Sequence, residues 1–174
     1  MSRRITRATR ILARAVSVFL SVCLFLSFAA CGMGTSVTPL EAVRDMIAVE
    51  KPTPHGKLYS LFPDAYGCEP LSEELIANLF GNGAYPPEMD GVRDAACFLS
   101  YRDLCEISVF YCRSSDAADE VALLLLRRLD LLRRERPDCA EKLEHASVTV
   151  RGRWALLCVS GDTDALLRVF RRTV

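Results

Sequence analysis

The chain has 174 residues, and its 22 basic and 22 acidic side chains give a formal net charge of zero. All the acidic residues follow Cys31, whereas five arginines precede it, so residues 31–174 hold 17 basic and 22 acidic residues and carry a net charge of −5. A net acidic domain has no electrostatic attraction to phosphate backbones, which argues against nucleic acid as a partner. The 144 residues from Cys31 onward are enough for one domain with its own core.

The first 34 residues have the parts of a secretory signal. A basic start is followed by an uncharged apolar run over residues 15–30, which leads directly into Cys31. This run has 16 residues, whereas a membrane-spanning helix needs about 20. Its end resembles the lipobox of bacterial lipoproteins, with Phe28 in place of the usual Leu, Val or Ile. We therefore predict a lipoprotein signal peptide over residues 1–30, with cleavage between Ala30 and Cys31.

Lipidation of Cys31 would anchor the protein to the extracytoplasmic face of the cell membrane. Residues 31–38 would form the lipidated tether. Two acyl chains, at about 0.8 kcal/mol per buried CH₂, hold a protein stably on a membrane. The alternatives are an N-terminal signal or anchor helix that is not cleaved, and a secreted soluble form.

The chain contains eight cysteines, which is many for its length. Cys23 lies in the predicted signal peptide and Cys31 is the predicted lipidation site. Six would remain in the mature domain, and an oxidising exterior favours pairing among them. No two have the Cys-x-x-Cys spacing, so a zinc site or a thioredoxin-like site lacks support. Disulfides and buried free thiols both stay open for Cys68, Cys97, Cys105, Cys112, Cys139 and Cys158.

Helix signals recur along the rest of the chain. Thr38, Pro39 and Glu41 form a capping pattern that begins a helix ending near residue 49. A second helix opens with acidic residues after Ser72 and ends at glycines near residue 81. The longest helix is capped by Ser115 or Asp116 and ends at about residue 136. The last helix begins at Thr163 or Asp164 and ends at about residue 172. The long helix ends in basic residues that suit its dipole, or that contact anionic lipid headgroups: Arg127, Arg128, Arg133, Arg134 and Arg136.

Strand signals come in two pairs. Residues 95–101 and 106–112 are short apolar runs joined by a turn, and residues 146–151 and 154–160 flank Gly152. Residues 51–70, rich in proline and glycine, read as an irregular connection. We therefore predict a single α+β domain over residues 39–174, with an antiparallel sheet of about four strands in two hairpins and helices packed on it. The predicted core packs the long helix on the strands: Val121, Leu125, Leu129 and Leu132 against Ile107, Val109, Leu156 and Val159.

Residues able to perform catalysis are few. The two histidines, His55 and His145, lie in a loop and at a strand entrance, and Trp154 is expected in the core. No phosphate-binding loop or nucleophile elbow is present in the sequence, and we predict no catalytic residue, metal or cofactor. The sequence favours a non-catalytic binding module at the cell surface, with an unknown protein or peptide as partner. The alternative is an envelope enzyme or thiol-redox protein that uses the mature cysteines; a transport-associated substrate-binding lipoprotein would need a longer mature chain.

Several structural features follow one another along residues 101–172. They are the strand at residues 106–110, Arg128 and Leu129 in the basic-ended helix, Pro137 followed by Glu141 and Lys142, the hairpin at Gly152 with residues 154–160, and the helix after Asp162. In these features the chain resembles a small family of Gram-positive bacterial lipoproteins that carries the label domain of unknown function 4358. Its cysteine and arginine content departs from the lysine-rich pattern of that family. The resemblance implies fold and location but no catalytic residue.

Overall fold

The computed structural model describes residues 37–174, except residues 65, 66, 82 and 84. By its internal contacts the chain divides into two units, residues 1–36 and Val37–Val174, and the second is described below. The predicted signal peptide or anchor helix, Cys23 and the lipidation site Cys31 lie outside the described residues, so those interpretations stay predictions. Among the described helices, none is both long and apolar enough to cross a membrane.

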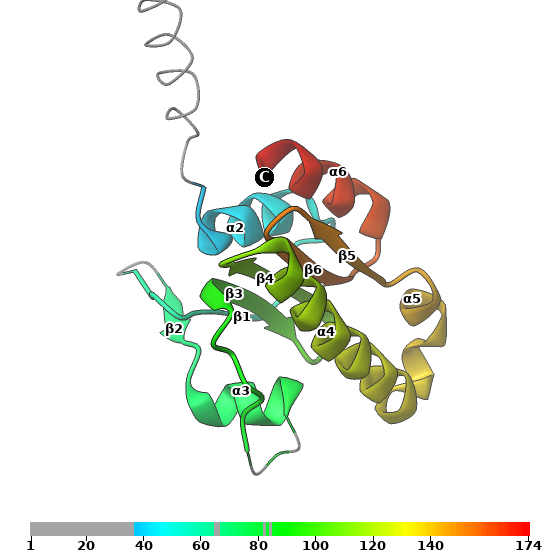
Figure 1. Cartoon of the computed structure of the whole chain (residues 1–174). Helices are drawn as coiled ribbons and strands as arrows, with labels where there is room; N and C mark the ends of the chain where they lie inside the picture. Colours follow the sequence, from blue (N-terminus) through cyan, green and yellow to red (C-terminus); the bar gives the residue numbers. More distant parts are fainter. Residues whose placement is uncertain (1–36, 65–66, 82, 84) are drawn as a thin grey trace, which may run out of the picture. The chain divides into compact units, whose positions relative to one another are not determined.

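The domain is α+β and is built on one mixed sheet of six strands in the order β2-β1-β3-β4-β6-β5 (Figure 1). Both predicted hairpins are present, β3 with β4 and β5 with β6, and an antiparallel β4–β6 pairing joins them. Strands β1 and β2 pair in parallel with each other, and β1 pairs antiparallel with β3. The strand bounds are β1 Lys57–Ser60, β2 Cys68–Pro70, β3 Val92–Ser100, β4 Cys105–Cys112, β5 Ser147–Arg151 and β6 Trp154–Val159.

The prediction of a four-stranded, purely antiparallel sheet is therefore wrong at one edge. Strands β1 and β2 lie in the segment that was expected to be irregular, and they contain only four and three residues. Strands this short have no measurable alternation. Strand β1 forms because β3 offers its backbone groups along Lys57–Ser60, and β2 forms by pairing in parallel with β1.

The described helices are α2 Pro39–Val49, α3 Glu73–Phe80, α4 Ser115–Glu135, α5 Ala140–Glu144 and α6 Thr163–Thr173, with a short 3₁₀ turn at Pro137–Cys139. Thr38 and Glu41 form the predicted capping box of α2. The cap of α4 lies one residue earlier than predicted, because the side chain of Ser114 accepts a hydrogen bond from the Ala117 N–H. Asp162 likewise caps α6 through the Ala165 N–H.

Helices cover both faces of the sheet (Figure 1): α2 and α6 lie on one face, and α3 and α4 lie on the other. Strand β4 is consequently buried along almost its whole length, and its apolar residues on both faces suit this position. Each face has its own apolar cluster, so the sheet separates two cores.

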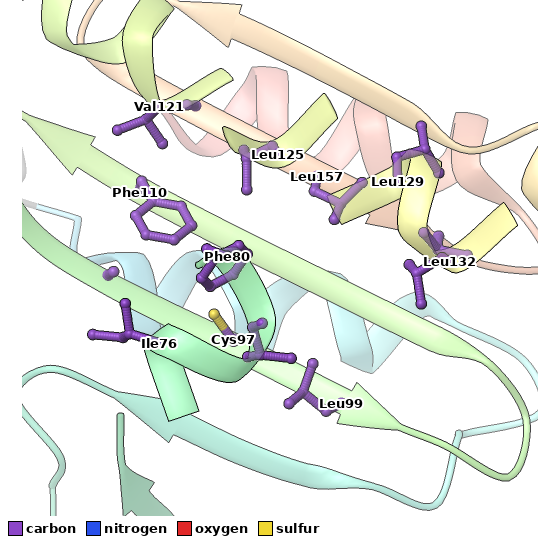
Figure 2. Packing of buried hydrophobic residues seen from close by; sticks show 14 of the residues in the cluster. Ile76, Phe80, Cys97, Leu99, Phe110, Val121, Leu125, Leu129, Leu132 and Leu157 are labelled. Carbon is purple, nitrogen blue, oxygen red and sulfur yellow. The ribbon is translucent and has the colours of Figure 1, made fainter. Parts of the chain in front are cut away.

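The core beneath α4 contains the four predicted helix residues, Val121, Leu125, Leu129 and Leu132 (Figure 2). They pack on Phe110, Leu157 and Val159 from the sheet and on Phe80 from α3. The rings of Phe80 and Phe110 meet edge to face with centroids 5.3 Å apart. Three of the four strand residues predicted to pack against α4 do not belong to this core. Ile107, Val109 and Leu156 lie on the other face of the sheet, in the cluster with α2 and α6.

Candidate functional site

A pocket opens at one end of the sheet, where four segments converge. These segments are the end of α2 with the loop after it, the turn between β3 and β4, helix α5, and the loop between β6 and α6. The pocket has a volume of about 440 Å³, within the range of about 300–1,000 Å³ that is usual for small-molecule sites. We call it the Glu50 pocket; its lining residues are Glu50, Lys51, Pro52, Thr53, Pro54, His55, Arg102, Asp103, Cys105, Lys142 and Gly161.

Glu50 is the buried acid of this pocket. It follows the last residue of α2, and only 6% of its surface is exposed. Its Oε1 atom accepts a hydrogen bond of 2.9 Å from the backbone N–H of Gly161, which joins α2 to the loop before α6. Its Oε2 atom is buried and has no hydrogen-bond partner among the described residues. Buried carboxylate oxygens are normally bonded, so Oε2 lacks the donor that such an atom usually has.

The outer part of the pocket carries mostly positive charge. Lys51 and Arg102 are exposed, and Lys142 is half-buried, with its Nζ donating a 2.6 Å hydrogen bond to the carbonyl oxygen of Asp103. Among the described residues of the lining, the one carboxylate besides Glu50 is that of the exposed Asp103. Three cations therefore face two acids, and the buried acid is Glu50.

Hydrogen bonds fix the turn and the loop that border the pocket. The Oγ of Ser100 donates a 2.7 Å hydrogen bond to the carbonyl oxygen of His55, which ties the loop after α2 to the end of β3. Leu104, in the turn, has a left-handed backbone with φ of 41° and a buried side chain. This conformation is unfavourable for a leucine and is retained because its side chain packs in the core beneath α4.

Cys105 lines the same pocket, but its thiol is a poor nucleophile. Burial, and next the negative charge of Glu50, raise the pKa of this thiol to about 12. Burial also raises the pKa of Cys97 and of Cys158 to about 12, and that of Cys112 to about 11. The six described cysteines are free thiols, and the pKa of the partly exposed Cys68 and Cys139 is raised as well, chiefly by burial. Because their pKa values are raised, these thiols are protonated at neutral pH. They are therefore weak nucleophiles, since the thiolate is the reactive form.

A second acid, Glu106 of β4, lies on the opposite face of the sheet and is only 3% exposed. Arg128 of α4 binds both of its carboxylate oxygens, with Nε at 3.1 and 3.2 Å and a second nitrogen at 2.8 Å. Burial opposes the charge on Arg128, but the hydrogen bonds and charge of Glu106 outweigh it and raise the pKa of the guanidinium. Arg128 is therefore a core residue, and the expectation that it lies among the surface cations at the end of the helix is wrong.

The other predicted residues are dispersed over the domain. Arg133 pairs with Asp130 at 3.2 Å and Arg136 with Asp138 at 2.9 Å, so both neutralise local acids. His145 is exposed and far along the sequence from the pocket-lining His55. Trp154 is half-buried, with its ring 4.7 Å from that of Tyr111. Within the described part of the chain, no group of three or more His, Cys, Asp or Glu residues is arranged to hold a metal ion.

The sequence analysis missed both buried acids, Glu50 and the Glu106 that pairs with Arg128, for different reasons. Arg128 lies on the apolar face of its helix, three residues after Leu125 and four before Leu132, which is a signal for a buried charge. Glu50 has no such signal, because its burial depends on Gly161, a residue 111 positions away.

No family model, curated protein or solved structure matches this chain.

Proposed function

We propose that this protein is a lipid-anchored extracytoplasmic domain that binds a ligand at the cell surface without transforming it. The anchor rests on the sequence, which places Ala30 and Cys31 at the end of a basic and apolar leader. The resemblance to the lipoproteins labelled domain of unknown function 4358 agrees with this location and is proposed together with it.

The observation that carries the binding role is the Glu50 pocket. It combines a suitable volume, a buried carboxylate with one oxygen unbonded, and a cationic outer part. The described residues place no nucleophile with an adjacent base in it, since the Cys105 thiol is held protonated by burial. Such a site can select and hold a charged molecule by hydrogen bonds and charge.

The thiol-redox alternative receives less support. A redox cysteine is usually exposed and has a lowered pKa, whereas the four buried thiols have pKa values raised to about 11 or 12. A protein or peptide partner at the cell surface is compatible with the binding role.

The anchor is tested by the intact mass of the protein extracted from its native membrane. We expect a chain that begins at Cys31 and carries a diacylglyceryl group, and we expect Cys31→Ser to leave the membrane fraction. An unmodified amino terminus at Met1 in the native protein would contradict the anchor.

The binding role is tested by equilibrium dialysis of the full-length protein against a small-molecule extract of the cell envelope, read by mass spectrometry. We expect one or more compounds to be retained with unchanged mass, and to be lost with Lys142→Glu, which reverses a charge in the lining. A compound that is consumed while a new mass appears would instead identify an enzyme.

A further inference from the structure

We propose that the Glu50 pocket binds a small zwitterion, whose protonated amine donates a hydrogen bond to Oε2 of Glu50 and whose carboxylate lies against Arg102 and Lys142. This inference rests on the proposed binding function and specifies the chemical class of its ligand.

The first step is the unbonded oxygen itself. Only 6% of the surface of Glu50 is exposed, yet just one of its two carboxylate oxygens is bonded. Oε1 accepts a hydrogen bond from the backbone N–H of Gly161. Leaving a buried polar group without a partner is unfavourable, and more so for a charged group. A donor that reaches Oε2 would remove this cost, so the pocket gains free energy from a ligand with such a donor.

The second step is the charge of that donor. Within the described residues Glu50 forms no ion pair, and Lys142, a cation of the pocket lining, donates to the Asp103 carbonyl instead. A cationic donor makes a charge-assisted bond to a carboxylate that is about twice as strong as a neutral one. The donor set does not suit a metal ion, as no cluster of three ligands is present among the described residues. A protonated amine fits these conditions.

The third step is the opposite end of the ligand. A simple amine would neutralise Glu50 but leave the cations Lys51, Arg102 and Lys142 facing the pocket. A carboxylate is a natural partner for these side chains, and guanidinium groups bind it in a bidentate manner. A molecule that carries an amine at one end and a carboxylate at the other matches a buried acid and a cationic rim together.

The test measures binding of three amino acids to the full-length protein by isothermal titration calorimetry. Glycine, β-alanine and γ-aminobutyrate have the same end groups separated by one, two and three methylenes, and methylammonium and acetate represent the two ends alone. We expect at least one of the amino acids to bind, and to bind more tightly than either single-ended compound. Loss of one charge-assisted hydrogen bond weakens binding about tenfold or more, which is the effect expected for Glu50→Gln.

Matched variants separate a local effect from a loss of folding. Glu144→Gln removes an exposed acid of α5 that does not line the pocket, and its affinity should equal that of the wild type. Arg102→Gln should weaken the amino acid but leave methylammonium binding unchanged, because it affects only the carboxylate end. Thermal unfolding of each variant verifies that it is folded.

Several results would overturn the ligand class. They are binding of acetate as tight as that of any amino acid, equal affinity of the wild type and a folded Glu50→Gln, or no binding of the three amino acids. If dialysis still retained an unaltered envelope compound, the binding function would stand and only the zwitterion would be rejected. If dialysis also retained nothing, both would fail.

Discussion

Two buried glutamates lie on opposite faces of the sheet, and their surroundings differ. Glu106, beneath α4, has both oxygens bound by Arg128 at 2.8–3.2 Å. Glu50, at the end of α2, has one oxygen bound by a backbone N–H and the other unbonded. A buried ion pair whose hydrogen bonds are all formed stabilises the packing of the elements it joins. A buried acid with one unbonded oxygen in the lining of a pocket is instead a candidate for ligand binding. The same side chain is thus structural in one place and a candidate binding group in the other.

The largest effect should come from breaking the pair at Glu106. Arg128→Met leaves a carboxylate buried without its partner, and we expect a loss of about 3–5 kcal/mol in the free energy of unfolding. Urea denaturation followed by circular dichroism measures it. The double variant Glu106→Leu with Arg128→Met should recover most of the loss, because the uncompensated charge is gone. A change below about 1 kcal/mol in the single variant would mean that the pair behaves like one on the surface.

Leu129, the residue next to Arg128, separates loss of packing from loss of charge. Its side chain is 3% exposed and belongs to the core beneath α4 (Figure 2). Leu129→Ala should cost about 2–5 kcal/mol through lost burial and the cavity left behind. Leu123, 57% exposed on the same helix, is the matched control, and Leu123→Ala should change the stability by less than about 0.5 kcal/mol. Equal losses in the two variants would contradict the described face of α4.

These two positions also show how far the sequence predicts the fold. The long helix and the hairpin strands have strong periodicity, so their existence and type follow from the pattern. The face of the sheet on which each strand residue lies does not follow from the pattern. Strand β4 is apolar on both sides, so its alternation does not show which side packs against α4. Ile107 and Val109 were therefore placed on the wrong face. Strands β1 and β2 do not follow from the local sequence, because β1 is stabilised by pairing with distant β3 and β2 by pairing with β1.

The candidate site was less predictable than the fold. Its residues come from four separate segments, and only the folded chain brings Glu50 to Gly161. A glutamate after an amphipathic helix is ordinarily a solvated residue, so nothing local indicates its burial. The cysteine alternatives stayed open in the sequence for a similar reason, since pairing depends on distances that spacing does not give.

Each glutamate also has a buried cysteine near it, and this predicts an alkaline sensitivity. Glu50 adds to the raised pKa of Cys105 and Glu106 to that of Cys97, although burial is the main cause and brings both to about 12. The unfolded thiols ionise near their ordinary value of 9.0, so the unfolded chain releases protons that the folded chain retains. The stability these groups contribute is therefore complete below pH 9 and is lost progressively as the pH rises from 9 toward 12.

Urea titrations at several pH values between 8 and 11 measure this loss. Cys97→Ala and Cys105→Ala should each make the decline less steep, whereas Cys139→Ala, at a partly exposed position, should leave its slope nearly unchanged. A stability that stays constant up to pH 11 would show that the thiols ionise in the folded protein as easily as in the unfolded chain.

Of the single substitutions at the two buried acid sites, Glu50→Gln should have the smaller effect on stability, and the size of this effect tests whether the two glutamates differ. The glutamine oxygen can still accept the Gly161 N–H, and the change removes a buried charge that has no ion-pair partner among the described residues. We therefore expect the free energy of unfolding to change by less than about 1 kcal/mol, against about 3–5 kcal/mol for Arg128→Met. Glu144→Gln provides the baseline for an exposed acid. A loss of about 3 kcal/mol for Glu50→Gln would mean that Oε2 is already bonded in the free protein. The two glutamates would then have the same role, and the pocket would lose the group on which ligand binding depends.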